Sequence, residues 1–345
     1  MTVAAISGAA PLPRRHRRRA LILLGLAGAA GTAVLLSLRI GSVPLDTATV
    51  LAALMAPDNS DAHAIVRELR LPRTVLGAAV GAALAVAGAI MQAVTRNPLA
   101  SPTILGLNAG AIFAVVCAVF VLGIADPAQY LWFAFLGALG AAALVFAIGS
   151  AGRGGATPVK LALAGTVVTA LLSSWVSGIL IFDQRTLDEA RFWLAGSLGG
   201  RDLEAFFRVA PLMAAGIATG LALGHSLNAL GLGRDVATAL GQRTAWLRVI
   251  ATATVVLLAG SAVAVAGPIG FVGLAVPHMV RGLLGPDYRW VLPGCAVGGA
   301  ALLLTADVIG RVIARPGEVE AGIITALVGA PVLIHIVRRP RLTGL

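Results

Sequence analysis

The sequence predicts an all-α protein that crosses a membrane several times, and three observations lead to this class. Hydrophobic residues make up 58% of the 345-residue chain and charged residues only 12%, whereas soluble proteins average about 25% charged residues. The mean hydropathy is +0.93. The apolar residues also gather in long runs without charge, and no segment between these runs is long enough to form a folded soluble domain.

Nine runs lack Asp, Glu, Lys and Arg altogether, and their lengths suit membrane-spanning helices, which need about 20 apolar residues. They cover residues 20–38, 74–95, 97–125, 127–152, 161–182, 209–233, 249–280, 290–306 and 321–337. The 32 residues of run 249–280 are too many for one span and too few for two spans with an ordinary loop. Gly267 and Pro268 divide this run into a helix that ends at Ala266 and a shorter one that begins near Phe271. We therefore expect ten transmembrane helices, with both termini on the same side.

The distribution of basic residues predicts which side that is. With the N-terminus in the cytoplasm, inner segments hold 16 of the 26 Lys and Arg residues and outer segments hold ten, as the positive-inside rule requires. Of the acids, only Asp235 and Asp287 fall inside. We expect residues 1–19 to be a disordered, basic cytoplasmic N-terminus, 20–339 a single transmembrane domain and 340–345 a cytoplasmic tail. A cleaved signal peptide is the alternative for the first run, but its 19 apolar residues exceed the usual roughly 7–15.

A repeat relates the two halves of the chain. The segment GAALAVAG begins at Gly81 and GSAVAVAG begins at Gly260, 179 residues later, and the same offset relates Pro98 to Pro277. A looser echo relates the fifth and tenth predicted helices. In the predicted topology the copies, helices 2–5 and 7–10, run in opposite directions, and inverted repeats are typical of transport folds. Broken Gly/Pro backbone after each copy is tolerated at membrane depth where protein or a water-filled cavity surrounds it.

The sequence offers little support for catalysis, metal binding or nucleic-acid binding. His278 lacks a second ligand at metal spacing, so a structural role is the simpler interpretation and a proton relay the alternative. Cys117 and Cys295 lie in apolar runs, which indicates buried thiols without a disulfide framework. The net charge of +11 comes from arginines at the ends of apolar runs, where they set topology. The single lysine, Lys160, is outside any Gly-Lys-Ser/Thr motif, so the chain has no phosphate-binding P-loop.

The longest inner connection, residues 225–248, reads HSLNALGLGRDVATALGQRTAWLR. It predicts two short helices that are broken around Gly231 to Gly233. We expect one apolar face, made of Leu227, Leu230, Leu232, Val236 and Leu240. One interpretation is an amphipathic element on the membrane surface. The other is a coupling element that fits a groove on a partner ATPase.

Four segments resemble the FecCD-type permeases, which are the membrane subunits of ABC importers for ferric siderophores, haem and cobalamin. The segments are 69–111, ALGLGRDVATALG at 229–241, GPIGFVGLAVPHMVRGLLGPDYRWVLPG at 267–294, and RPGEVEAGIITALVGAP at 315–331. The resemblance extends from about residue 20 to residue 339. It implies a ten-helix subunit that works in a dimer with two cytoplasmic ATPases and an external substrate-binding protein.

The resemblance also assigns roles to individual residues. Arg70, Arg73 and Arg311 match positions at which family members dock acidic residues of the binding protein, and exposed guanidiniums pair with carboxylates in an oriented, bidentate way. Interfacial arginines that extend toward water are the alternative. The matching ATPase-coupling residues are Leu232, Gly233, Arg234, Asp235, Ala239, Leu240 and Gly241. The chain departs from the family pattern at Arg234, where an acid is common, and at Glu320, which adds an outer acid.

In similar proteins the fifth and tenth helices line the translocation path. The candidates here are small residues, namely Thr166, Thr169, Ser173, Ser174, Ser177, Thr325 and Gly329. A wide and weakly polar wall suits a bulky chelate, whose metal arrives with its ligands filled, so we expect no metal site in this chain. Small residues that merely allow close helix packing are the alternative.

These observations predict the permease subunit of an ABC importer in the bacterial plasma (inner) membrane. The expected cargo is a ferric siderophore, with haem and cobalamin as alternatives. The expected partners are a second permease, either a copy or a paralogue, two ATPases that hold ATP and Mg²⁺, and an external binding protein; this chain itself is expected to bind no cofactor. A proton-coupled transporter that uses Asp307, expected at a solvated helix end, or His278 is the rival. A membrane-embedded enzyme is a second rival, although no catalytic pair is found.

Overall fold

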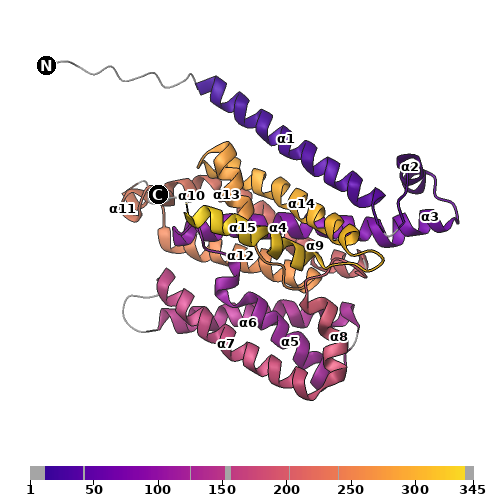
Figure 1. The fold of residues 1–345 in the computed structure, drawn as a ribbon. Coiled ribbons are helices and arrows are strands. Elements are labelled where there is room, and N and C mark those ends of the chain that lie inside the picture. Colours follow the sequence, from indigo (N-terminus) through magenta and orange to yellow (C-terminus); the bar gives the residue numbers. More distant parts are fainter. Residues whose placement is uncertain are drawn as a thin grey trace.

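The structure, a computed structural model, describes residues 12–338 except 42, 125, 152–156, 202 and 240. Every regular element in these residues is a helix. In chain order they are α1 (Leu12–Arg39), α2 (Thr47–Met55), α3 (Asp61–Ala64), η1 (Ile65–Arg70), α4 (Leu71–Thr95), η2 (Pro102–Leu105), α5 (Leu107–Leu122), α6 (Pro127–Ser150), α7 (Pro158–Phe182), α8 (Gln184–Leu194), α9 (Leu203–Ala222), α10 (Gly224–Gly231), α11 (Arg234–Ala239), α12 (Thr244–Ala266), α13 (Val272–Leu284), α14 (Tyr288–Ile313) and α15 (Ala321–Arg338). In Figure 1, α10 and α11 lie at one end of the molecule, and α2, α3 and α8 lie at the other. Following the predicted topology, we call these the inner and outer ends.

The apolar helices coincide with the predicted spans. Within the described residues, seven helices are long and apolar enough to cross a membrane, and three shorter apolar helices, Leu107–Leu122, Val272–Leu284 and Ala321–Ile334, accompany them. Each predicted span overlaps one of these helices, although runs 97–125 and 209–233 also include η2 and α10, and this confirms an all-α membrane fold. The number of crossings and the side of each terminus stay predictions.

The N-terminal boundary differs from the prediction. α1 begins at Leu12, so residues 12–19 are helical rather than disordered. The charged start of α1 continues directly into its apolar stretch without a Gly or Pro to end the helix. Residues 1–11 and 339–345, which include the predicted tail, lie outside the described residues.

The long apolar run divides at the predicted position. α12 ends at Ala266 and α13 begins at Val272, with a non-helical segment between them. Gly267 has a φ of 72°, and a β-carbon there would lie 2.1 Å from the carbonyl oxygen of Trp193, so the turn requires glycine. Phe271 also has a positive φ, of 64°, which is unfavourable for a residue with a side chain.

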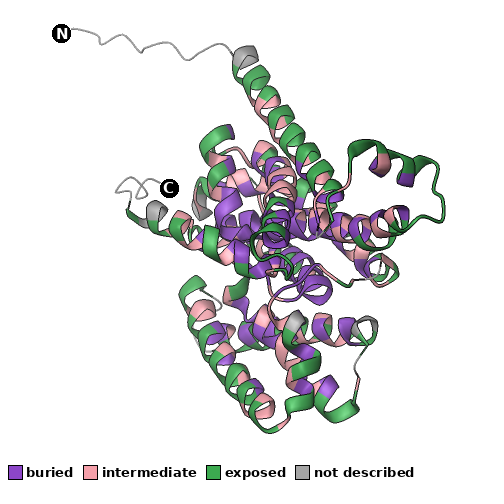
Figure 2. Ribbon diagram, turned by 45° about the vertical axis from the view of Figure 1, so that its right-hand side comes forward, coloured by how far each residue is buried: buried purple, intermediate pink, exposed green. Residues whose placement is uncertain are grey.

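The core lies around α4, which packs against both α12 and α14, at the centre of Figure 2, where buried residues gather. Glycines allow the closest approaches: a β-carbon on Gly81 would lie 2.3 Å from the carbonyl oxygen of Gly299, and one on Gly88 would lie 1.8 Å from that of Gly273. In Figure 1, α5 to α8 form a layer below this core and α1 crosses above it. Only 17% of the spanning residues of α1 and of α7 are buried, so their apolar faces must meet lipid or another chain.

The packing supports the predicted repeat. α4, the first helix of the first copy, packs against α14, the third helix of the second copy. In the same way α12, the first helix of the second copy, packs against α6, the third helix of the first copy. The offset partners Gly81 and Gly260 both lie at these contacts between copies. The proline register is wrong, however, because Pro277 lies inside α13 whereas Pro98 lies in the loop between α4 and α5. The reason is that α4 continues to Thr95, beyond the repeated segment, whereas α12 ends with it.

Candidate functional site

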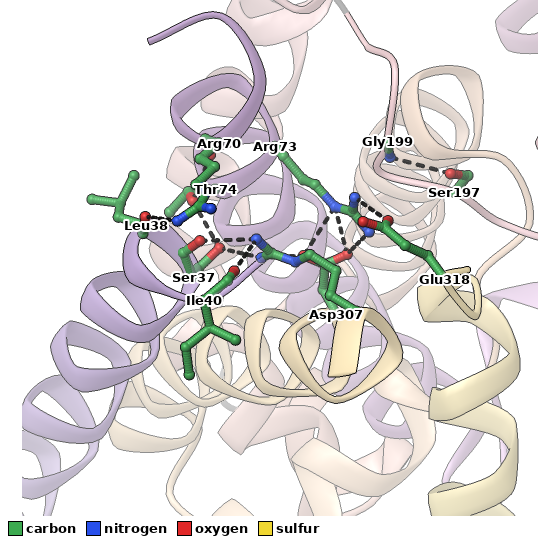
Figure 3. A network of polar contacts seen from close by, with 11 residues as sticks. Ser37, Leu38, Ile40, Arg70, Arg73, Thr74, Ser197, Gly199, Asp307 and Glu318 are labelled. Carbon is green, nitrogen blue, oxygen red and sulfur yellow. Dashed lines mark hydrogen bonds and ion pairs between the residues drawn. The ribbon is translucent and has the colours of Figure 1, made fainter. Parts of the chain in front are cut away.

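A buried ion-pair network joins three elements at the outer end (Figure 3). Asp307 of α14 has no exposed surface. Arg73 of α4 donates from Nε to both of its carboxylate oxygens, at 2.9 and 3.1 Å, and Arg311 donates from Nη2 at 2.6 Å. Arg73 also pairs with Glu318, in the loop before α15, at 2.6 Å. The expectation that Asp307 lies at a solvated helix end is therefore wrong.

Arg70 and Arg311 are also buried, with 4% and 2% of their surfaces exposed. Both donate to the C-terminal end of α1, where the last helical carbonyls lack partners within the helix and where positive charge is favourable. The accepting carbonyls belong to Ser37, Leu38, Arg39, Ile40 and Val43. These contacts fasten α1 to α4 and α14.

This geometry changes the interpretation of the three predicted docking arginines. The prediction assumed exposed guanidiniums, and the structure contradicts that premise for Arg70 and Arg311. The side chain of Arg73 is 12% exposed and is already paired with two carboxylates. The immediate role of all three is to hold the outer ends of the helices together. A contact between them and a binding protein stays a prediction.

A cavity of about 400 Å³, which we call the outer cavity, adjoins this network. Its charged lining residues are Glu68, Arg70, Arg73, Arg201, Arg311 and Glu318. The four arginines outnumber the two lining carboxylates, even when the buried Asp307 is added. The outer cavity therefore favours negatively charged groups.

The predicted coupling loop contains two short helices, α10 and α11, which are separated at Leu232 and Gly233 as predicted. The expectation of a single apolar face is wrong. Leu227 and Leu230 are fully buried, whereas Leu232 is 65% exposed and Val236 is 46% exposed. The break turns the chain, because Gly233 has a φ of 114°.

The other predicted coupling residues are placed only in part. Ala239 is exposed, and Gly241 has a φ of 79° in the turn that precedes α12. Arg234 and Asp235 begin α11, and Leu240 lies outside the described residues. A coupling role for these residues stays a prediction.

α10 is held to the rest of the bundle by a cluster that we call the Asp287 clamp. Asn228 of α10 donates to Asp287 Oδ1 at 2.7 Å and accepts from the backbone N–H of Tyr288 at 2.8 Å. Asp287 also accepts from Arg289 at 2.8 Å and from Arg19 of α1 at 3.5 Å. Near the C-terminal end of α10, Arg96 also donates to the carbonyl of Leu230 at 2.7 Å. These contacts tie α10 to the ends of α4 and α14.

The electrostatics of this clamp keep Asp287 ionised. The side-chain hydrogen bond from Arg289, followed by that from Asn228, holds the pKa of Asp287 well below its ordinary value of 3.8, despite the opposing effect of burial. The carboxylate also caps the N-terminus of α14 by accepting from the backbone N–H of Arg289. An inner groove of about 620 Å³ runs beside the clamp, between α10 and the ends of α4 and α14.

The predicted path residues fall into two groups. On α7, Thr166, Ser173, Ser174 and Ser177 are exposed, and Thr166, Ser173 and Ser177 follow one stripe of the helix. Thr169 is half-buried, against η2.

On α15, by contrast, Thr325 and Gly329 are buried and line a cavity of about 110 Å³ between α13, α14 and α15. A β-carbon on Gly329 would lie 2.4 Å from that of Phe271, so this glycine makes room for the Phe271 side chain. The structure does not bring the two groups together, since α7 packs on α5, α6 and α8 and α15 packs on α13 and α14.

The remaining candidates from the sequence are His278 and the two cysteines. His278 is half-buried inside α13, directly after Pro277. Among the described residues, no group of three or more His, Cys, Asp or Glu side chains is placed to hold a metal ion. Cys295 is buried and Cys117 is half-buried, and both are free thiols.

The sequence reasoning missed the Asp287 clamp and the pairing of Arg73 with Glu318. Asp287 was recognisable, since it is one of only two acids on the predicted inner side and directly precedes a helix, where aspartate is a favoured cap. Arg73 and Glu318 are 245 residues apart in the chain, and no local pattern relates them.

Comparison with known proteins places this geometry in a family. The model of the FecCD transport family matches residues 29–339. The siderophore transport system permease protein YfiZ of Bacillus subtilis is 46% identical over 89% of this chain and 92% of its own length. The ferric enterobactin transport system permease protein FepD of Escherichia coli is 46% identical over 93% of this chain and 96% of its own length.

Solved structures agree with this relationship. An inward-facing metal-chelate type ABC transporter superposes with a TM-score of 0.80 at 30% identity, over 92% of this chain and 99% of its own. The PsaBC structure from Streptococcus pneumoniae, at 18% identity and a TM-score of 0.55, shares the fold. The extent of the family match and the agreement of the folds show that this membrane protein belongs to the FecCD transport family.

Proposed function

We propose that the chain is the permease subunit of an ABC importer that carries a ferric siderophore across the bacterial plasma membrane. The observation that carries the proposal is the family match over residues 29–339, together with relatives named as ferric enterobactin, iron-citrate and iron-hydroxamate permeases. Haem is the second candidate cargo, because a hemin permease of Yersinia pestis is 38% identical to this chain.

The coupling element supports an ATPase on the inner side. α10 is anchored through Leu227, Leu230 and the Asp287 clamp, yet Leu232 and Val236 at the turn into α11 are exposed. An element that is fixed to the bundle on one side and presents apolar residues on the other can bind a partner and transmit that partner's movement to the bundle. We propose that two ATPase subunits contact it and that they, rather than this chain, hold ATP and Mg²⁺.

The translocation path is proposed to lie between two permease subunits. The stripe of Thr166, Ser173 and Ser177 faces away from the chain's own core, so a second subunit can complete a wall around it. Small hydroxyl side chains offer few strong contacts to a chelate that must pass without being retained. The partner permease is a second copy or a paralogue, and an external binding protein delivers the cargo at the outer end.

The proton-coupled alternative receives less support from the geometry. Asp307, its main candidate carrier, is buried and shared by two permanently charged guanidiniums, which hold the carboxylate in place. A proton carrier needs access to water on both sides in turn.

The test is a purification of the chain with its neighbouring gene products in lipid nanodiscs. ATPase activity is measured with a panel of binding proteins that are preloaded with ferric siderophores, haem or cobalamin. We expect one ferric siderophore-loaded protein to stimulate hydrolysis. A preparation that contains no ATPase, and that no loaded protein stimulates, would contradict the proposal.

A further inference from the structure

α13 contains a proline in its interior, which leaves one backbone carbonyl without its usual partner. Pro277 lies six residues after the N-cap Phe271 and has no backbone N–H. In an α-helix that N–H would donate to the carbonyl four residues earlier, which here belongs to Gly273. Gly273 is buried, and a carbonyl that a proline frees at membrane depth needs a donor from a neighbouring element.

Gln92 of α4 supplies this donor. It is only 3% exposed, and its Nε2 donates to the carbonyls of Gly273 and Leu274 at 3.4 and 3.5 Å. Both distances exceed the usual roughly 2.9–3.0 Å, and one NH₂ group is shared between the two acceptors. A side chain of α4 therefore replaces the hydrogen bond that Pro277 removes from α13.

Arg281 fixes the direction of the Gln92 amide, because its Nη2 donates to Gln92 Oε1. Arginine has donors only, so the amide oxygen must face Arg281 and the NH₂ group must face the two carbonyls. Arg281 lies in the last turn of α13, whereas the two carbonyls lie in its first turn. Gln92 therefore holds both the start and the end of α13 to α4.

Gln92 also lies between the coupling element and α15. One turn further along α4, Arg96 donates to the carbonyl of Leu230 in α10, and Gln92 itself lines the inner groove beside that helix. Directly before α13, Phe271 packs on Gly329 of α15. A chain of contacts therefore runs from α10 through α4 and α13 to α15.

We propose that Gln92 is a positioning residue that joins α13 to α4, so that a movement of α10 reaches α15 and the translocation path. This inference rests on the proposed function and deepens it, because it names the contact that links ATP hydrolysis to the path. The amide has two tasks. It satisfies the carbonyl that Pro277 leaves free, and through Arg281 it ties the end of α13 to α4. With both in place, α13 follows α4 instead of bending at its proline.

The experiment measures siderophore uptake per ATP hydrolysed in proteoliposomes that contain the complete complex. Gln92→Met removes both tasks while keeping an unbranched side chain, and the ratio should fall about 2- to 30-fold. ATPase activity should persist, since Arg96 still holds the coupling element. The matched control is Thr254→Val, which removes a buried hydroxyl that donates to the Ile250 carbonyl of its own helix and should leave the ratio unchanged.

Second-site changes separate the two tasks. Pro277→Ala restores a backbone N–H for the Gly273 carbonyl, which then no longer needs Gln92. Gln92→Glu loses the amide donor but keeps an acceptor for Arg281, whose Nη1 is buried and has no acceptor among the described residues. The ratio should therefore be low in Gln92→Glu and should recover most of the wild-type value when Pro277→Ala is added. Gln92→Met with Pro277→Ala should stay low, because the end of α13 remains untied from α4.

Three results would overturn the inference: a normal ratio in Gln92→Met, a low ratio in Gln92→Glu that Pro277→Ala does not improve, or a parallel loss of uptake and ATPase activity, which would mean that Gln92 only stabilises the fold. A wild-type complex without ATP-dependent uptake would contradict the proposed function instead. Melting temperatures test the contact independently of transport, since Pro277→Ala should raise the melting temperature more in Gln92→Glu than in wild type.

Discussion

Replacing Asp307 by asparagine should destabilise the fold by about 3 kcal/mol, the lower end of the range for breaking a buried ion pair. The substitution removes the charge that two guanidiniums share at 2.8 and 2.6 Å. Neither arginine is left without partners, because Arg73 keeps Glu318 and Arg311 keeps carbonyl acceptors of α1. This residual pairing is the reason for choosing the lower end of the range.

The assay is reversible unfolding in mixed micelles, followed by tryptophan fluorescence. The control is Thr305→Ala, two residues earlier on the exposed side of α14, where only a hydroxyl bond to the Ala301 carbonyl is lost. That change should stay within about 0.5 kcal/mol. If Asp307→Asn is as stable as this control, the network does not hold the outer end together.

A double-mutant cycle tests whether the residues act as one unit. Asp307→Asn and Arg311→Gln share a contact, so their effects should differ from the sum by about 0.5–3 kcal/mol. Asp307→Asn and Arg289→Gln lie at opposite ends of α14 and should add within about 0.5 kcal/mol. Additivity in the first cycle would refute the reasoning.

Three further predictions concern packing, the path and the inner clamp. Gly88→Ala should destabilise the fold by about 1–3 kcal/mol in the same unfolding assay, because the new methyl would lie 1.8 Å from the carbonyl oxygen of Gly273; an unchanged stability would contradict this close approach. Ser177→Trp fills the exposed stripe of α7 and should abolish uptake while leaving the melting temperature within error, whereas normal uptake would place the path elsewhere. The pKa of Asp287 is lowered in the folded state, so the clamp stabilises above the ordinary value of 3.8 and this contribution is lost as the pH falls below it. The difference in melting temperature between wild type and Asp287→Asn should therefore be constant from about pH 5 to 8, and a difference that varies across that range would contradict the assignment.

Features set by local chemistry were predictable from the sequence. The helix break at Gly267 and Pro268 and the division of the coupling loop at Gly233 follow from residues whose backbone preferences differ from those of their neighbours. The spans themselves follow from hydrophobicity and length. Each of these features depends on a few adjacent residues.

Features set by contacts between distant segments were not predictable. An arginine at a helix end can extend toward water or turn inward and donate to buried acceptors, and the outcome for Arg70 and Arg311 depends on where the end of α1 lies. The expectation of a solvated helix end at Asp307 was wrong for the same reason, because Arg73, which pairs with Asp307, lies 234 residues away in the chain. The contact between Gly329 and Phe271 was likewise not predictable, and a place for Thr325 and Gly329 in the translocation path stays a prediction.

The central claim is that this chain carries a ferric siderophore with energy from ATP hydrolysed by a partner. The most direct test is uptake of ⁵⁵Fe-labelled siderophore into proteoliposomes that contain the permease and ATPase subunits, with the loaded binding protein on the outer side and ATP enclosed. We expect uptake that requires enclosed ATP and stops when the ATPase carries an inactivating substitution. Uptake that continues with the inactive ATPase and follows an imposed proton gradient would contradict the claim.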